Sequence, residues 1–160
     1  ASAGLIFDGM PLLAHELAHQ WFGDLITCSD WAHIWLNEGF ATYFETMYME
    51  RSEGVERMME GLARMKRWYI GETKSYKRAV VTYNFERPGS MFDGHTYSKG
   101  AWVLHMLRRE LGDTLFFKGV HMVEFAPRMV CTHFFVKIYA KETKMLRISG
   151  VSCLIQTSLV

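Results

Sequence analysis

Residues 15–24 read HELAHQWFGD, which places His15 and His19 four positions apart, with Glu16 directly after the first histidine. Residues four apart lie on one face of an α-helix, with Cβ atoms about 5–6 Å from each other. The surrounding stretch is apolar, and polar groups bound for a protein interior need partners there. A fold that contains this helix must therefore bring another polar group to the two imidazoles.

The segment WLNEGFATYFE, residues 35–45, offers that partner in Glu38. Eighteen residues separate it from His19, which is room for a turn and a return along the first helix. Zinc in hydrolytic sites takes three protein ligands and leaves the fourth position to water, and two histidines with one glutamate form a common set. The sequence therefore predicts one zinc ion per chain, bound by His15, His19 and Glu38.

Glu16 has a different predicted role, that of general base. Zinc brings the pKa of a bound water toward about 7, and a neighbouring carboxylate can take the proton of that water and deliver it to a leaving amine. The alternative to a metal site is a chance occurrence of the motif. A bare HExxH pattern is expected by chance in roughly 2% of chains of this length. The added Glu38 makes chance a poor explanation.

The rest of the chain predicts a mainly α fold. Asp8 is the expected cap of the first helix, and Gly23 and Gly112 are expected helix ends. Residues 79–85 (AVVTYNF) form the one strand-like run, and residues 86–95 are expected to be a loop. The predicted helices cover approximately residues 8–22, 36–51, 55–65, 98–111 and 113–126, followed by an amphipathic face of Phe134, Phe135, Ile138 and Tyr139.

Charge and cysteine content exclude some classes of function. The net charge is +1 and basic residues do not cluster, so nucleic acid or an anionic membrane is not an expected partner. The sequence has no run of eighteen apolar residues, so no membrane segment is predicted. Cys28, Cys131 and Cys153 are widely spaced and indicate no disulfide framework. Free thiols favour a reducing, cytoplasmic location.

Two stretches resemble the zinc aminopeptidases of the aminopeptidase N and leukotriene hydrolase family, the gluzincins, and bacterial members most closely. The first, HELAHQWFGDLITCSDWAHIWLNEGF, matches the family pattern of HExxH followed by eighteen residues and Glu. The second, HTYSKGAWVLHMLRRELGDTLF at residues 95–116, is similar to the family's tyrosine-bearing helix. The resemblance implies a peptide or oligopeptide substrate and removal of N-terminal amino acids. Epoxide hydrolysis and a non-catalytic relative are the alternatives.

The resemblance also implies roles for two further residues. It makes Tyr97 the donor of a hydrogen bond to the oxyanion of the tetrahedral intermediate, a charge that appears only in the transition state. Without the resemblance, Tyr97 would be read as an ordinary aromatic residue at a helix start. Glu45 lies seven residues after Glu38 on the same helix face. It is expected either to orient a histidine ligand or to be a solvated glutamate.

The resemblance predicts the helical half of a thermolysin-like metallopeptidase catalytic domain, truncated at both ends. Residues 1–126 would be part of the catalytic core, and residues 127–160 a partial helical segment with an atypical, poorly ordered tail. The family's GxMEN segment, which reads the substrate's amine, is not among these 160 residues. The isolated chain is therefore expected to hydrolyse substrates feebly. The sequence leaves the oligomeric state and the side-chain preference open.

Overall fold

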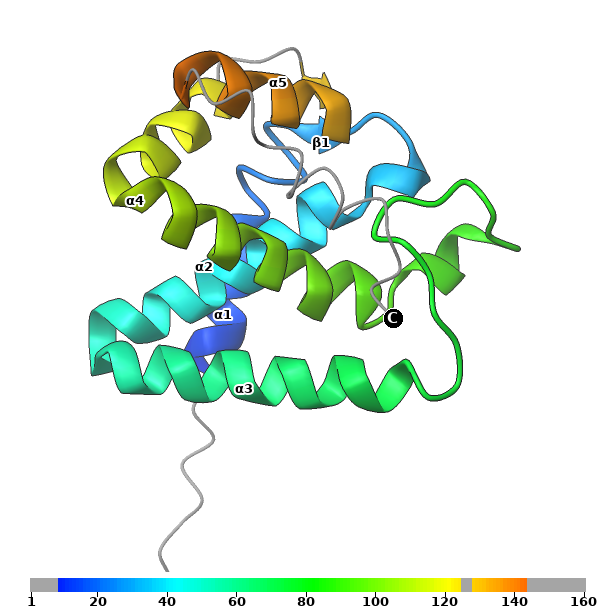
Figure 1. Ribbon diagram of the computed structural model, residues 1–160, viewed down its shortest axis with the longest axis horizontal. Coiled ribbons are helices and arrows are strands. Elements are labelled where there is room, and N and C mark those ends of the chain that lie inside the picture. Colours follow the sequence, from blue (N-terminus) through cyan, green and yellow to red (C-terminus); the bar gives the residue numbers. More distant parts are fainter. Residues whose placement is uncertain (1–8, 125–127, 144–160) are drawn as a thin grey trace, which may run out of the picture.

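The computed structural model describes residues 9–124 and 128–143, and most of them are helical (Figure 1). The predicted mainly α fold is confirmed. The elements in chain order are α1 (Met10–Ala18), β1 (Thr27–Cys28), η1 (Trp31–His33), α2 (Trp35–Glu53), α3 (Val55–Glu72), η2 (Pro88–Met91), η3 (His95–Lys99), α4 (Gly100–Glu124), β2 (Met129–Val130) and α5 (Thr132–Thr143).

Helix α2 is the centre of the fold, and α1, α3, η3 and α4 all pack against it. Every residue from 35 to 43 is buried, so this half of α2 contacts other elements on all sides. A helix that is surrounded in this way belongs to a core rather than to a surface. The core cluster combines α2, α4 and α5 through large side chains, among them Trp35, Phe40, Tyr43, Leu104, Phe116, Phe135 and Tyr139.

Two glycines allow α2 and the start of α4 to approach closely. A Cβ atom added at Gly39 would lie 3.1 Å from the Cα of Gly100 and 3.3 Å from the carbonyl oxygen of Thr96. A Cβ atom at Gly100 would in turn lie 3.1 Å from the Cα of Gly39. Because these neighbours are backbone atoms, side chains at either position would push the two elements apart. The contact lies beside Glu38 and three residues from Tyr97 along the chain.

The helix ends differ in part from the prediction. Gly112 interrupts α4 with φ 73° and ψ 163°, which agrees with the predicted end there. The first helix is shorter than predicted, since it ends at Ala18 and a hydrogen-bonded turn follows before Gly23. The predicted cap, Asp8, and the tail at residues 149–160 lie outside the described residues.

The strand predicted at residues 79–85 is wrong, because this segment is irregular. The guanidinium group of Arg78 donates hydrogen bonds to the carbonyl oxygens of Ala79 (2.9 Å) and Val80 (3.2 Å), which a strand would use for pairing. The strands that do form were not predicted: Thr27 and Cys28 pair in parallel with Met129 and Val130. Such two-residue strands carry no periodic signal in the sequence.

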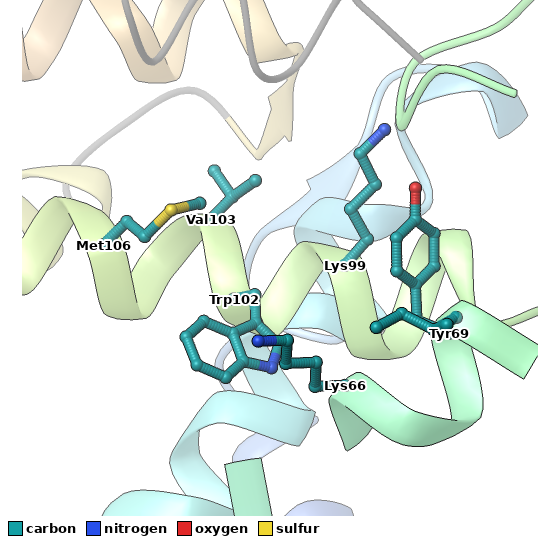
Figure 2. A pocket seen from close by; sticks show the side chains of 7 residues that line it. Lys66, Tyr69, Lys99, Trp102, Val103 and Met106 are labelled. Atoms are coloured by element: carbon teal, nitrogen blue, oxygen red, sulfur yellow. The ribbon is translucent and has the colours of Figure 1, made fainter. Parts of the chain in front are cut away.

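An open cavity of about 280 Å³ lies between α3 and the start of α4 (Figure 2). It is lined by Lys66, Tyr69, Ile70, Lys99, Trp102, Val103 and Met106. None of the residues predicted to bind metal or to act in catalysis lines it, so it is separate from the predicted site. Among the described residues, no helix is long and apolar enough to cross a lipid bilayer.

Candidate metal centre

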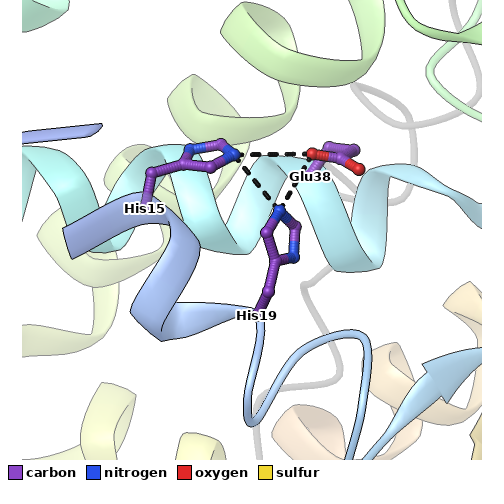
Figure 3. Close-up of side chains that lie close together, drawn as sticks. All are labelled: His15, His19 and Glu38. Atoms are coloured by element: carbon purple, nitrogen blue, oxygen red, sulfur yellow. Dashed lines mark hydrogen bonds and ion pairs between the residues drawn. The ribbon is translucent and has the colours of Figure 1, made fainter. Parts of the chain in front are cut away.

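The three predicted ligands meet between α1 and α2 (Figure 3). His15 lies in α1, His19 directly follows the helix, and Glu38 lies in the first turn of α2. The Nε2 atoms of the two histidines are 3.2 Å apart. The Oε2 atom of Glu38 is 3.6 Å from Nε2 of His15 and 3.3 Å from Nε2 of His19. His15 and Glu38 are buried, and His19 is half-buried.

These distances fit a small tetrahedral ion. Zinc binds histidine nitrogen and carboxylate oxygen at about 2.0–2.2 Å, which at tetrahedral angles separates neighbouring ligand atoms by about 3.3–3.5 Å. The triangle formed by His15, His19 and Glu38 has sides of 3.2, 3.6 and 3.3 Å. A point about 2 Å from all three atoms therefore exists, and two nitrogens with one carboxylate oxygen suit zinc.

A hydrogen bond orients the imidazole of His19. Nδ1 of His19 lies 3.0 Å from the carbonyl oxygen of Phe22, to which it donates, so Nε2 is the ring nitrogen that faces His15 and Glu38. The ring of Phe22 stacks on that of Phe40 with centroids 4.2 Å apart, which fixes the turn that carries the carbonyl. The role of Phe22 was not predicted, because any residue type supplies a carbonyl group.

Glu45 lies on the Nδ1 side of His15, as expected if it orients that histidine. Its Oε2 atom is 3.8 Å from Nδ1 of His15, and its Oε1 atom is 3.7 Å from the guanidinium group of Arg64. Burial raises the pKa of Glu45, while the charges of His15 and Arg64 oppose that shift. The half-buried position and the two partners favour the orienting role over a solvated carboxylate. The contact between Arg64 and Glu45 was not predicted from the sequence.

The point where the three ligands meet attracts positive charge. Burial opposes ionisation of Glu38, but hydrogen bonds from His15 and His19 outweigh it and lower the pKa of Glu38 to about 2. The hydrogen bond to Glu38 is also the largest influence on His19, and it raises the pKa of His19 to about 9 against the effect of burial. A carboxylate held ionised beside two imidazoles is the environment that a divalent cation needs.

Glu16 and Tyr97 lie on one open cavity with His15. The cavity has a volume of about 570 Å³ and is lined by Leu12, His15, Glu16, Thr42, Glu45, Arg64, Met65, Trp68, Tyr97 and Ser98. The ring of Tyr97 stacks over that of His15 with centroids 6.2 Å apart. Burial raises the pKa of the Tyr97 phenol, and so do the charge of Glu38 and a hydrogen bond to it. The phenol therefore stays protonated and able to donate at neutral pH.

The peptidase family M1 domain matches residues 9–153. The chain is 37% identical over 112 residues to glutamyl aminopeptidase of Bitis rhinoceros, covering 68% of this chain and 12% of that protein. It is 36% identical over 118 residues to aminopeptidase N of Rattus norvegicus, covering 69% of this chain and 12% of that protein. The chain thus spans about one eighth of the length of these relatives.

A solved structure shares the fold. The M1 zinc metallopeptidase of Deinococcus radiodurans, in a mutant form bound to a Tyr-Ser-Ala substrate, superposes with a TM-score of 0.78 and 30% sequence identity. The match covers 94% of this chain and 34% of that one. Together with the domain match over residues 9–153, this shows that the chain belongs to the peptidase M1 family and is a helical portion of its catalytic domain.

Proposed function

We propose that this chain carries the zinc-binding catalytic centre of a metallo-aminopeptidase, which hydrolyses peptide bonds and releases N-terminal amino acids. The observation that carries the proposal is the triangle of His15, His19 and Glu38 at tetrahedral ligand spacing. One of the three, His15, lines the cavity that also holds Glu16 and Tyr97. The names of the relatives support the choice of an aminopeptidase over other zinc hydrolases.

The three ligands would hold zinc, which supplies a Lewis acid that polarises the scissile carbonyl and lowers the pKa of water toward about 7. Two neighbouring residues, Phe22 and Glu45, would orient the histidine ligands. The carbonyl oxygen of Phe22 keeps His19 in the tautomer with a free Nε2. The carboxylate of Glu45, 3.8 Å from Nδ1 of His15, would favour the same tautomer of His15 through its charge. Neither imidazole then has to rotate when the ion is bound.

Glu16 would act as the general base and later as the general acid. It is exposed and lines the cavity, so its carboxylate can reach both water and substrate. It would take a proton from the attacking water and pass it to the amine that leaves. Its neighbour on α1, His15, is a ligand, so the helix itself sets the distance between base and reacting atoms.

Tyr97 would stabilise the tetrahedral intermediate. Its raised pKa keeps the phenol protonated, so it can donate a hydrogen bond to the oxygen on which negative charge develops. The partly buried position limits competition from water, which makes such a bond more effective than one in bulk solvent.

The deciding experiment changes Glu16→Gln in the full-length protein that contains this sequence. The variant should retain one equivalent of zinc and lose hydrolysis by about 10²–10⁴-fold, since an amide cannot accept the proton of water. Zinc is measured by elemental analysis and activity with aminoacyl substrates. The matched control is Glu56→Gln, an exposed carboxylate on α3, which should leave both unchanged. Full hydrolysis by Glu16→Gln would rule out the assigned base.

The same assay tests the class of substrate. A metallo-aminopeptidase should prefer a free α-amine, so an N-acetylated substrate should react far more slowly than its unblocked counterpart. Equal rates for the two substrates would contradict removal of N-terminal residues, while leaving zinc-dependent hydrolysis in place.

A further inference from the structure

Tyr97 lies on a π-helical turn rather than on an ordinary α-helix. The backbone N–H of Lys99 donates to the carbonyl oxygen of Gly94 at 2.9 Å, five residues back, and η3 runs from His95 to Lys99 before α4 begins at Gly100. Short π-helical segments are rare and frequently occur at functional sites. A π-helical turn is less stable than a continued α-helix, so contacts with other residues must stabilise it here.

Asp93 holds the start of the turn. Its Oδ1 atom accepts hydrogen bonds from the backbone N–H groups of His95 and Thr96, each at 3.0 Å. Its main-chain carbonyl oxygen accepts from the N–H groups of Thr96 and Tyr97, also at 3.0 Å. One residue therefore satisfies the free donors of the first turn and fixes the direction in which the backbone enters it.

Arg78 in turn holds Asp93. Its Nε donates to Oδ2 at 2.8 Å and its Nη2 to Oδ1 at 2.5 Å, which is the two-pronged pairing that arginine makes with carboxylates. The same guanidinium group donates to the carbonyl oxygen of Met91 at 3.2 Å and to Oγ1 of Thr96 at 2.8 Å. Tyr76 also donates to Oδ2 of Asp93. The irregular segment after α3 is thereby tied to η3.

Neither Arg78 nor Asp93 is among the residues that line the cavity of the metal centre. Both are largely buried, with side chains 12% and 8% exposed. Apart from the bonds of Arg78 to Ala79 and Val80 and the bond of Tyr76 to Asp93, the hydrogen bonds of the two side chains end on residues 91–96, directly before Tyr97. Any effect on chemistry in that cavity must therefore pass through η3.

We propose that Arg78 and Asp93 are positioning residues for Tyr97: their ion pair caps η3 and sets the direction of the phenol toward the oxyanion. This inference rests on the proposed function, because it assigns the pair to the same reaction. Donors to an oxyanion act only when they lie at hydrogen-bond distance from the place where charge develops, so a small rotation of η3 is costly.

The same region offers a rival reading as a second cation site, since ligand atoms of Glu72, Asp93 and His95 lie within 4.8 Å of one another. Two contacts argue against it. The backbone N–H of Arg78 donates to Nε2 of His95 at 3.3 Å, so the neutral ring carries its proton on Nδ1. A protonated Nδ1 has no lone pair to offer a metal, although it lies 3.2 Å from Oε2 of Glu72, and the guanidinium group of Arg78 already neutralises Asp93.

The test is a double-mutant cycle between Asp93→Asn and Tyr97→Phe in the full-length, zinc-loaded protein. Asn keeps the shape of Asp but loses the charge that Arg78 pairs with. Asp93→Asn alone should lower kcat about 10-fold, with KM changed less than about 2-fold and zinc content unchanged. In the Tyr97→Phe background, the same change should lower kcat by less than about 2-fold, because the group being positioned is gone.

The matched control is Arg108→Gln. The side chain of Arg108 is also 12% exposed and donates to Glu50 and Asp113, but it lies on α4 and does not line the cavity of the metal centre. It should lower stability without changing kcat. If Asp93→Asn does not fold, Arg78→Lys serves in the same cycle, because lysine keeps the charge but cannot bond both carboxylate oxygens.

Equal losses of kcat from Asp93→Asn in both backgrounds would overturn the inference, as would loss of zinc from that variant. Neither result would touch the proposed function. An unchanged kcat in Tyr97→Phe alone would instead contradict the role proposed for Tyr97, and the inference with it. A change in KM without a change in kcat would likewise overturn the positioning role.

Discussion

Tyr97 and Glu16 reach the same cavity from different parts of the chain, and the roles proposed for them differ: donor to the oxyanion and general base. Glu16 is next to a ligand on α1, so the HExxH spacing alone fixed its place. Tyr97 stacks on His15 from η3, 82 residues later. Only the resemblance to known aminopeptidases marked it, since a lone tyrosine before a helix carries no pattern that points to chemistry.

Replacing Tyr97 by Phe removes one donor and keeps the ring that stacks on His15. We expect kcat to fall about 10²–10³-fold with a modest change in KM, because the lost hydrogen bond forms only as charge develops on the oxyanion. Steady-state kinetics of the zinc-loaded, full-length protein would measure both constants. An effect confined to KM would place the phenol in substrate binding instead.

The residues around the ligands show where prediction from sequence ends. Helical spacing was enough to bring His15 and His19 together, because the helix repeat decides which side chains share a face. Glu38 joins them from α2, and its distance of nineteen residues from His19 allowed a return along the first helix. The carbonyl oxygen of Phe22 and the guanidinium group of Arg78 could not be predicted in the same way. Their partners depend on the path of irregular segments, which no periodicity describes.

Among the helices, α2 was predicted within about two residues at each end, whereas α1 was predicted too long. The reason is that a glycine, Gly54, directly follows α2, while α1 ends in a turn stabilised by backbone hydrogen bonds. The prediction of a strand at residues 79–85 failed because contacts with other residues decide the path of this segment. Its β-branched residues favour a strand, but no strand within residues 9–124 and 128–143 pairs with it, and Arg78 donates to two of its carbonyl groups.

The contact between α2 and α4 should be sensitive to one added methyl group. Gly39→Ala would place Cβ 3.1–3.3 Å from backbone atoms of Gly100 and Thr96, and we expect a loss of stability of about 1–3 kcal/mol from overpacking. Chemical denaturation would measure it. Gly71→Ala on α3 is the control, since its Cβ would meet nothing within 4 Å and alanine favours the helix. An equal loss from both changes would argue against the close approach.

Across the described part of the molecule, α1 presents an apolar face that no described element covers. Leu12, Leu13 and Leu17 are 57–59% exposed, and Trp21 beyond the helix is 43% exposed. Exposed apolar side chains favour association with other protein surfaces. This face lies on α1, the helix that carries His15.

The 160-residue chain expressed alone should therefore self-associate. We expect elution ahead of a monomer in size-exclusion chromatography, and a shift toward the monomer when Leu13→Glu and Leu17→Lys are combined, since charged side chains keep the face hydrated. The zinc content of the double variant should equal that of the unchanged chain, because neither residue contacts the ligands. Monomeric behaviour of the unchanged chain would contradict the role assigned to this face.

The central claim is that His15, His19 and Glu38 together bind one zinc ion. The most direct measurement is a crystal structure of the zinc-loaded protein with anomalous scattering recorded at the zinc absorption edge. One strong peak should lie about 2.0–2.2 Å from Nε2 of each histidine and from a carboxylate oxygen of Glu38. A peak at Glu72, Asp93 and His95 instead, or a structure in which one of the three ligands points away from the ion, would contradict the claim.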